Sequence, residues 1–265
     1  MSDPLSPAEA AKSAAAAKAA EYVKSGMKLG LGTGSTAAWL VKHLGERVRS
    51  EGLEIVGVPT STRTLAQARD EGIPITTLDE AKWLDLTIDG ADEYDADLAL
   101  IKGGGGALLH EKIVATASDR MIVIADDSKR VETLGAFPLP VEVVRFGWTA
   151  TRKLIEDVLS STDLDGTTIT VRQKDGEAFL TDEQHFILDL HLEFIDDVDS
   201  LGQRLLAVPG VVETGLFVDI ADTAIFGMAS GEVKVQVADG APAPLDPPSD
   251  DRLREMLTYI ETHQG

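Results

Sequence analysis

Three short clusters along this chain combine residue types that bind an anion and move protons. They are G-T-G-S-T at residues 32–36, D-G-A-D-E at 89–93 and K-G-G-G-G at 102–106. Each follows a short apolar segment, which predicts that each lies at the end of a β-strand. The chemistry they offer is capture of a phosphate group, acid–base catalysis by paired carboxylates, and close contact between glycine backbone and a ligand.

The cluster at 32–36 favours an anion site. Its glycines let backbone N–H groups approach the anion, and the predicted helix that follows presents its positive N-terminus. A plain strand-to-helix turn is the alternative. The cluster is not a dinucleotide-binding G-x-G-x-x-G motif, because Ala37 replaces the third glycine, and no lysine follows to make a P-loop. The candidate contact residues are Thr33, Gly34, Ser35 and Thr36.

The cluster at 89–93 places three acidic side chains within five residues. An Asp-Gly turn with a solvated charge cluster would have the same composition. Because the apolar segment 84–88 precedes it, however, we expect Asp89 at the edge of the sheet, over a pocket. Paired carboxylates in such a place can divide the acid and base roles of one reaction.

Lys102 and the four glycines after it form the rarest of the three patterns, because a glycine run costs chain entropy on folding. The run predicts close contact between backbone and ligand, with Lys102 as a cation. Glu111 lies nine residues further on, on a predicted helix, and Lys129 follows the D-D-S run at 126–128. Taken alone, Glu111 and Lys129 are as readily interpreted as surface side chains.

The composition excludes several classes of protein. Cysteine is absent, which excludes disulfides and thiolate catalysis, and the five histidines show no metal-ligand spacing. The 24 basic and 45 acidic residues give a formal net charge of -21, which argues against nucleic-acid and anionic-membrane partners. No apolar run approaches the ~18 residues of a transmembrane helix, and the N-terminus lacks the apolar core of a signal peptide. We therefore expect a soluble cytoplasmic protein without a metal.

The acidity has two interpretations, an ordinary acidic surface or adaptation to a high-salt cytoplasm. Acidic pairs such as Asp79-Glu80 suit a hydrated shell whose self-repulsion is screened within ~3 Å at 1 M ionic strength. The halophilic interpretation predicts that the fold loses stability below molar salt. Thermal melts in dilute buffer and in molar KCl test this, and equal midpoints would contradict it.

Helices and strands alternate over the first half of the chain, which predicts right-handed crossovers and a mostly parallel sheet. The S-P-A-E run at 6–9 begins a helix that ends near residue 24, with a capping serine and a glutamate completing a capping box. Because ligands bind at the carboxyl ends of parallel strands, the three clusters should meet at one edge of the sheet. The expected strands are 27–31, 54–58, 83–88, 98–101 and 121–125.

After residue 140 the pattern becomes β-α-β-β-α-β, the order of a ferredoxin-like domain. Its strands are expected at 141–145, 167–172, 186–192 and 211–217. Two more strands, 223–228 and 232–237, should return to the first sheet. The predicted fold is therefore α/β, with a mostly parallel Rossmann-like sheet domain and a second, smaller ferredoxin-like α+β domain. The predicted boundaries are 1–140 plus 218–239, then 141–217, then a C-terminal extension, 240–265, with a short helix at 253–262.

The motifs form an ordered set: G-T-G-S-T, D-G-A-D-E, K-G-G-G-G-A-L-L-H-E-K-I, A-D-D-S-K and F-P-L-P-V-E-V. With this set the sequence resembles ribose-5-phosphate isomerases of the A type over about residues 5–237. The family interconverts D-ribose 5-phosphate and D-ribulose 5-phosphate in the non-oxidative pentose phosphate pathway, without metal or organic cofactor. The resemblance also implies an α/β domain with a smaller ferredoxin-like one, and a homodimer or homotetramer.

The resemblance implies roles for individual residues. Glu111 matches the family's catalytic base, with Asp89, Asp92 and Lys102 as further catalytic residues. Four glycines stand where the family often has three and an alanine, and the tail from about 240 extends past the family's usual end. The implied substrate-binding residues are Thr33, Gly34, Ser35, Thr36, Asp89, Gly90, Ala91, Asp92, Lys102, Gly103, Gly104, Gly105 and Lys129.

Such an isomerisation moves a proton between C1 and C2 through an enediolate. The reaction needs one base for both carbons, acid–base catalysis at the two oxygens, hydrogen-bond donors for the oxyanion, and residues that bind the phosphate group. We expect Glu111 to move the carbon proton, the two aspartates to serve the oxygens, and Lys102 with the glycine N–H groups to stabilise the enediolate. The sequence does not decide which residues bind the phosphate group. Ser35 and Thr36 are one candidate pair, with Lys129 as an additional contact.

Other functions fit less well. A non-catalytic sugar-phosphate sensor would have no use for an acid–base set. An amino-sugar-phosphate deaminase or a coenzyme A transferase is disfavoured because no convincing catalytic histidine or transferase-type acid motif is present. A Rossmann dehydrogenase is disfavoured by Ala37 and by Val58-Pro59, which stands where an acidic residue should end the second strand.

Overall fold

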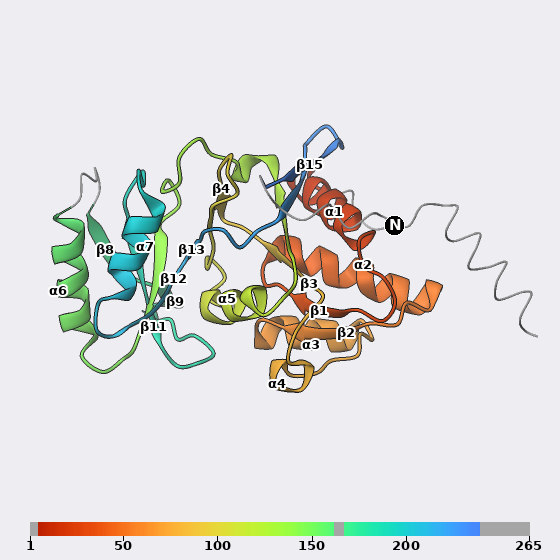
Figure 1. Ribbon diagram of the computed structural model, residues 1–265, viewed down its shortest axis with the longest axis horizontal. Helices are drawn as coiled ribbons and strands as arrows, with labels where there is room; N and C mark the ends of the chain where they lie inside the picture. The colour runs from red at the N-terminus through yellow and green to blue at the C-terminus, as the bar shows by residue number, and fades with distance from the viewer. Residues whose placement is uncertain (1–4, 162–166, 239–265) are drawn as a thin grey trace, which may run out of the picture.

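Short aliphatic segments alternate with helices in the first half of the chain, and this alternation builds a six-stranded sheet (Figure 1). The computed structural model describes residues 5–161 and 167–238. The sheet has the order β15-β14-β6-β3-β1-β2, and its strands are parallel except for the edge strand β15. The strands are β1 (Lys28–Leu31), β2 (Val56–Pro59), β3 (Leu86–Gly90), β6 (Met121–Asp126), β14 (Thr223–Gly227) and β15 (Val233–Val237).

Helices cover both faces of this sheet, which explains why β6 is buried along its whole length rather than at alternate residues. One face packs against the N-terminal helices in a single apolar cluster, and the other packs against α5 and a small third sheet. The helices of this part are α1 (Pro7–Ala20), α2 (Ser35–Glu51), α3 (Thr62–Asp70), α4 (Leu78–Ala81) and α5 (Leu108–Thr116), with a 3-10 turn at Asp127–Lys129.

The strand order reverses between β1 and β3. From β1 the chain moves outward to β2, whereas β3 lies on the other side of β1 and leads toward β6 and β14. Leu31 of β1 is in register with Ile88 of β3, so the G-T-G-S-T and D-G-A-D-E clusters leave the sheet side by side. Such a reversal opens a crevice at the carboxyl ends of the strands, which is where α/β proteins bind ligands.

The predicted β-α-β-β-α-β order is present in the second part, at the left of Figure 1. Its four strands are antiparallel in the order β12-β7-β11-β8, the ferredoxin-like arrangement, and both helices join its apolar cluster. A short hairpin, β9 (Gln173–Lys174) with β10 (Glu177–Ala178), extends it. The other elements are β7 (Leu139–Val143), α6 (Trp148–Leu159), β8 (Thr168–Val171), β11 (Phe186–His191), α7 (Val198–Leu206) and β12 (Val211–Thr214).

A third sheet joins the two parts, and it corrects two predicted strands. The segment 98–101 supplies only β5 (Leu100–Ile101), which pairs antiparallel with β4 (Glu93–Tyr94) instead of entering the parallel sheet. The link between β4 and β5 is too short for a crossover helix, so the two strands form a hairpin. The segment 211–217 is divided into β12 and β13 (Leu216–Phe217), and β13 completes the third sheet beside β5.

Several predicted boundaries also shift. The first helix ends at Ala20 rather than near residue 24, and β3 covers 86–90 rather than 83–88, which brings Asp89 inside the strand. Ser6 caps α1 as expected, but the carboxylate of Glu9 bonds to Lys12 and Trp39. The carboxylate of Glu9 therefore binds Lys12 and Trp39 rather than completing the predicted capping box.

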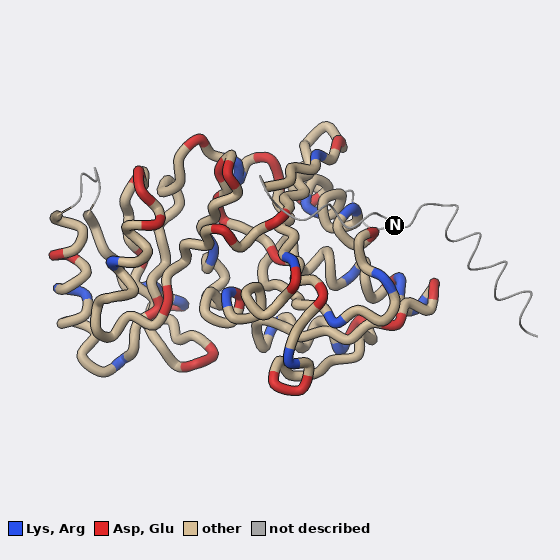
Figure 2. The backbone as a smooth tube through the Cα atoms, in the orientation of Figure 1, with Lys and Arg blue, Asp and Glu red and all other residues tan. Residues whose placement is uncertain are grey.

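Two predicted strands, 223–228 and 232–237, do return to the first sheet as β14 and β15. The division into domains at these boundaries stays a prediction, and the predicted extension and its helix lie outside the described residues. Acidic residues are distributed over both parts of the chain (Figure 2). Within the described residues no helix is long and apolar enough to cross a membrane.

Gly227 tests the packing of α1 on the sheet. A Cβ at this position of β14 would overlap the backbone of Ala11 in α1, so we expect Gly227→Ala to lower the free energy of unfolding by about 1–3 kcal/mol. Gly202 in α7 is the matched control, because a Cβ there meets only Leu216, at 3.6 Å, and alanine should stabilise the helix by about 0.5–1 kcal/mol. Urea unfolding of both variants measures the difference, and equal effects would contradict this packing.

Candidate active site

A cleft of about 320 Å³ opens at the crevice between β1 and β3. Its walls come from the loops after β1, β3, β5 and β6, from the first two turns of α1, and from the first turns of α2 and α5. Glycine backbone, hydroxyl groups and charged side chains dominate the lining, which suits a small, polar, anionic ligand. The lining residues are Ala8, Lys12, Thr33, Gly34, Ser35, Thr36, Gly90, Ala91, Asp92, Lys102, Gly103, Gly105, Glu111, Asp126, Ser128 and Lys129.

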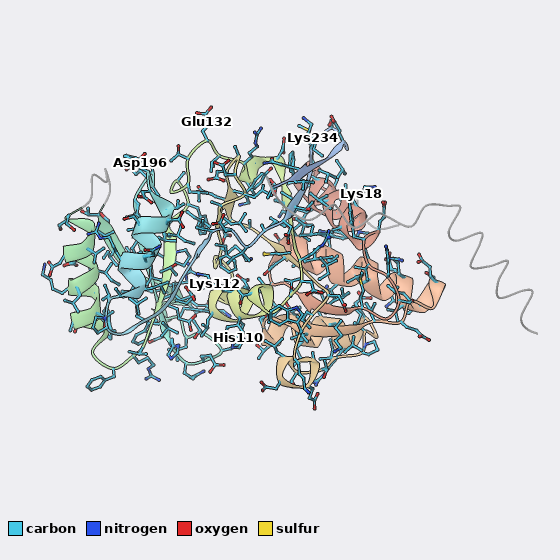
Figure 3. All side chains as sticks on the ribbon, viewed as in Figure 1. Lys18, His110, Lys112, Glu132, Asp196 and Lys234 are labelled. Carbon is cyan, nitrogen blue, oxygen red and sulfur yellow. The ribbon has the colours of Figure 1, made fainter. Side chains whose placement is uncertain are left out.

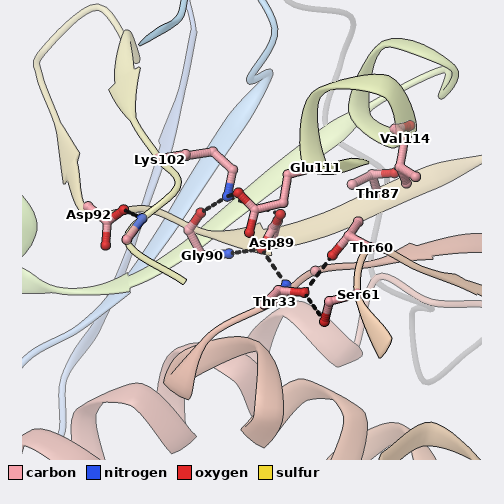
Figure 4. Close-up of polar contacts among 12 residues, drawn as sticks. Thr33, Thr60, Ser61, Thr87, Asp89, Gly90, Asp92, Lys102, Glu111 and Val114 are labelled. Atoms are coloured by element: carbon pink, nitrogen blue, oxygen red, sulfur yellow. Dashed lines mark hydrogen bonds and ion pairs between the residues drawn. The ribbon is translucent and has the colours of Figure 1, made fainter. Parts of the chain in front are cut away.

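Three charged side chains meet at the floor of this cleft (Figure 4). Lys102 Nζ lies 3.0 Å from Asp89 Oδ2 and 3.3 Å from Glu111 Oε2. The side chains of Lys102, Asp89 and Glu111 are 2%, 0% and 2% exposed, so the whole group is removed from bulk water. With all three ionised the group carries a net charge of -1 in a buried place, which is costly unless one carboxyl binds a proton.

Asp89 is held by backbone donors at the end of β3. Its Oδ1 accepts the N–H groups of Thr33, at 3.0 Å, and Gly90, at 2.7 Å. These bonds join the ends of β1 and β3. Because Oδ2 faces Lys102, the carboxylate ties the G-T-G-S-T loop to the ammonium group.

Lys102 is fixed at both ends. Its backbone N–H donates to Gly215 O at 2.9 Å, and its Nζ donates to Gly90 O at 2.6 Å. The Nζ also lies 5.3 Å from the centre of the Phe217 ring, within cation–π range. A Cβ on Gly215 would collide with Lys102 O, so the close approach of β13 requires glycine there.

Burial and charge act against each other on these groups. Burial raises the pKa of Glu111 from 4.5 to about 8, although Lys102 lowers it in part. Burial likewise raises the pKa of Asp89 against the opposing effect of Lys102. Burial alone would lower the pKa of Lys102, but the two carboxylates raise it overall, so the ammonium stays protonated. Glu111 is thus a carboxyl whose basicity is increased next to a permanent cation.

The glycine run turns sharply above this group. Gly103 and Gly106 have φ values of +100° and +80°, a region of backbone conformation that residues other than glycine rarely adopt. Gly106 N donates to Gly103 O at 3.0 Å. Gly104 N donates to Asp92 Oδ2 at 2.6 Å, which fixes the carboxylate of Asp92 beside the cleft. Four glycines in succession therefore allow a tight turn, and Gly105 leaves its backbone open to a ligand.

Known proteins are similar to this chain over most of its length. A family model described as ribose 5-phosphate isomerase A (phosphoriboisomerase A) matches residues 56–231. A ribose-5-phosphate isomerase A of a Ruegeria species is 59% identical over 236 residues, 89% of this chain and 90% of the relative. One from Cereibacter sphaeroides is 57% identical over 256 residues, covering 97% and 98% of the two chains.

The chain belongs to the ribose-5-phosphate isomerase A family. Solved structures agree with this membership. A ribose 5-phosphate isomerase from Plasmodium falciparum superposes with a TM-score of 0.80 at 40% identity, covering 85% of this chain and 97% of its own. Another, a D-ribose-5-phosphate isomerase in complex with phospho-erythronic acid, superposes with a TM-score of 0.79 at 38% identity and the same two coverages. The family is one of aldose–ketose isomerases, and the fold predicted from the resemblance is confirmed.

The structure gathers most of the residues that the sequence singled out. All except Asp89 and Gly104 line the cleft; Asp89 is fully buried, and Gly104 is exposed. Glu93, the third acid of D-G-A-D-E, is buried away from the cleft and accepts the N–H groups of Gly135 and Phe137, so it holds a loop. The hydroxyl of Thr33 bonds to Thr60, Ser61 and Thr64, and its N–H bonds to Asp89, so Thr33 holds this loop in place.

Helix α1 contributes two residues to the cleft that no sequence motif marks. Ala8 and Lys12, one turn apart on that helix, line the cleft because α1 packs against β6 and β14. No local motif marks Lys12, and its helical position alone suggests a surface residue. Asp126 and Ser128, beside Lys129, were also missed, although the D-D-S-K run carried them. Among the described residues no group of three His, Cys, Asp or Glu could hold a metal ion.

The buried carboxyl of Glu111 makes stability depend on pH. The folded chain binds its proton more tightly than the unfolded chain, because the pKa rises from 4.5 to about 8 on folding. The contribution of this group to stability therefore falls as pH rises through that window. We expect Glu111→Gln to raise Tm relative to wild type, by an amount that grows from pH 5 to pH 8 and then levels off.

Thermal melts across pH measure this effect. The exposed Glu232 supplies the matched control, since Glu232→Gln should change Tm little at any pH. A Glu111→Gln difference that stays constant over the same range would contradict the raised pKa.

Proposed function

We propose that this chain interconverts D-ribose 5-phosphate and D-ribulose 5-phosphate through an enediolate, with Glu111 as the base. The observation that carries the proposal is the position of Glu111, buried at the floor of the cleft with Oε2 3.3 Å from Lys102 Nζ. A carboxylate with a pKa near 8 accepts a proton from carbon more readily than an ordinary one near 4.5.

The isomerisation balances with one base, Glu111, and one donor to the negative oxygen, Lys102. Starting from the open-chain aldose, Glu111 removes the proton on C2, and the electron pair forms the C1–C2 double bond while O1 becomes negative. Return of the same proton to C1, with transfer of the O2 hydroxyl proton to O1, gives the ketose. No electron leaves the sugar, so the reaction needs no oxidant.

Lys102 stabilises the charge that develops on the oxygen. Its ammonium stays protonated beside Asp89 and Glu111, and Gly90 O and Asp89 hold it in one place before the substrate arrives. A preorganised donor of this kind lowers the barrier because it does not have to reorient during the reaction. Backbone N–H groups of the glycine run are the second source of donors.

The two aspartates divide their work. Asp92 lines the cleft, so we assign it the proton exchange between the hydroxyl oxygens and the opening of the sugar ring. Asp89 is fully buried and bonded to Thr33 and Gly90, so we assign it the positioning of Lys102. This assignment narrows the shared role that the sequence suggested for them.

The phosphate group is best placed at the N-terminus of α2. Gly34 caps this helix without a side-chain hydrogen bond, so the first N–H groups of α2 are available beside Ser35 and Thr36. Lys12 and Lys129 line the same cleft. The ion pair between Lys12 Nζ and Glu9 Oε1, at 2.8 Å, keeps the lysine directed. The solved relative in complex with phospho-erythronic acid supports a phosphorylated ligand for this chain.

Purified protein should convert ribose 5-phosphate to ribulose 5-phosphate with EDTA present, because every group in the proposed mechanism belongs to the chain. Product formation followed by ribulose absorbance tests this. Turnover that returns only when a metal is restored would contradict the cofactor-free mechanism. A homodimer or homotetramer, a cytoplasmic location and a place in the pentose phosphate pathway stay predictions.

Glu111→Gln should keep the fold and bind substrate but lose at least ~10²-fold in kcat, the scale of removing a general base. Steady-state kinetics at saturating substrate measures the loss, and Glu232→Gln controls for a loss of surface charge. Near wild-type turnover by a folded Glu111→Gln protein would refute the assignment of the base.

A further inference from the structure

Arg172 connects the second, ferredoxin-like part of the fold, which is the smaller one, to the glycine run. It follows β8 directly, and its Nη1 donates to Gly103 O at 2.5 Å and to Gly104 O at 3.3 Å. The other side of its guanidinium forms a two-bond pair with Asp189 of β11, through Nε to Oδ2 at 3.0 Å and Nη2 to Oδ1. Both side chains are 15% exposed. Such a planar fork is held far more rigidly than an ammonium group on a flexible stem.

These contacts fix the direction of two peptide groups. In a trans peptide the carbonyl and the following N–H point in opposite directions. Because Arg172 donates a hydrogen bond to the carbonyl of Gly103, the N–H of Gly104 points away from Arg172. That N–H donates to Asp92. Because Arg172 also donates to the carbonyl of Gly104, the N–H of Gly105, which lines the cleft, points away from Arg172 as well.

Without a side chain, a glycine peptide has little else to hold it. Gly103, Gly104 and Gly105 can each rotate between conformations that other residues avoid. The turn has one internal bond, from Gly106 N to Gly103 O, and the ring of Phe179 lies against Gly106. Arg172 donates to the same carbonyl of Gly103, so it anchors the turn from outside.

The helix that follows the glycine run is also held by the smaller part. His110 and Lys112, the neighbours of Glu111 labelled in Figure 3, pair with Glu183 at 2.9 Å and Glu213 at 2.6 Å. The carbonyls that Arg172 holds therefore lie in a segment that is fixed again a few residues later. Arg172 differs from these pairs in that it binds the loop that faces the ligand.

We infer that Arg172, held by Asp189, is a positioning residue for the isomerisation. It turns the carbonyls of Gly103 and Gly104 away from the cleft, and this directs the Gly105 N–H toward the reacting oxygens and holds Asp92 through the Gly104 N–H. The inference rests on the proposed function, because it assigns the glycine run to the enediolate. Arg172 touches no substrate atom itself.

Arg172→Ala should lower kcat about 10- to 100-fold and change KM much less, because the donors are misdirected while the phosphate site is intact. The affinity for phospho-erythronic acid should fall, whereas the affinity for inorganic phosphate should not. Asp189→Asn should show a smaller loss with the same pattern, and guanidinium ion at millimolar concentration should restore part of the activity of Arg172→Ala.

The matched control is Arg204→Ala. Arg204, on α7, also bonds to a backbone carbonyl, Val158 O at 3.0 Å, but it contacts neither the glycine run nor the cleft. It should lower Tm without changing kcat. Arg172→Ala with wild-type kcat and KM would overturn the inference, as would equal losses of affinity for both ligands.

If the wild type itself does not isomerise ribose 5-phosphate, the proposed function fails. The two binding affinities, measured by calorimetry, would still decide the role of Arg172. A selective loss of phospho-erythronic acid binding would uphold its positioning role, and unchanged binding of both ligands would overturn it.

Discussion

A lysine ammonium buried between two carboxylates is the interaction on which the rest of this structure depends. Lys102 neutralises Asp89 and Glu111 only in part, since two potential negative charges share one positive charge out of contact with water. Burial raises the pKa of Glu111 to about 8, so that a proton on this carboxyl relieves the remaining charge, and we propose the same carboxyl as the base of the isomerisation. Stability and the proposed catalytic role thus place opposite demands on the Glu111 side chain.

The fold brings this group together from distant segments. Asp89 comes from β3, Lys102 follows β5, and Glu111 lies in the first turn of α5. The third sheet holds Lys102 through Gly215 and Phe217, which belong to the segment that links β12 to the larger part. Arg172 and the pairs flanking Glu111 add contacts from the smaller part. The smaller part thereby contributes to the site although it supplies none of the residues that line the cleft.

Much of this could be predicted from sequence because the informative patterns are local. Alternating helices and strands gave the parallel sheet, and the motifs at 32–36, 89–93 and 102–106 lie together at its edge as expected. Local patterns could not show that β5 leaves the main sheet, or that Asp89 lies inside β3 rather than over the pocket. They also could not identify Lys12 or Arg172, because only tertiary packing brings these residues to the cleft and the glycine run.

The most direct test of this account is a titration of the Glu111 carboxyl itself. Protein with ¹³C-labelled glutamate carboxyls can be followed by NMR across pH, with the signal assigned by its loss in Glu111→Gln. The account predicts a midpoint near 8, which should move higher when Lys102→Met removes the neighbouring cation. A midpoint near 4.5, unaffected by Lys102→Met, would contradict it.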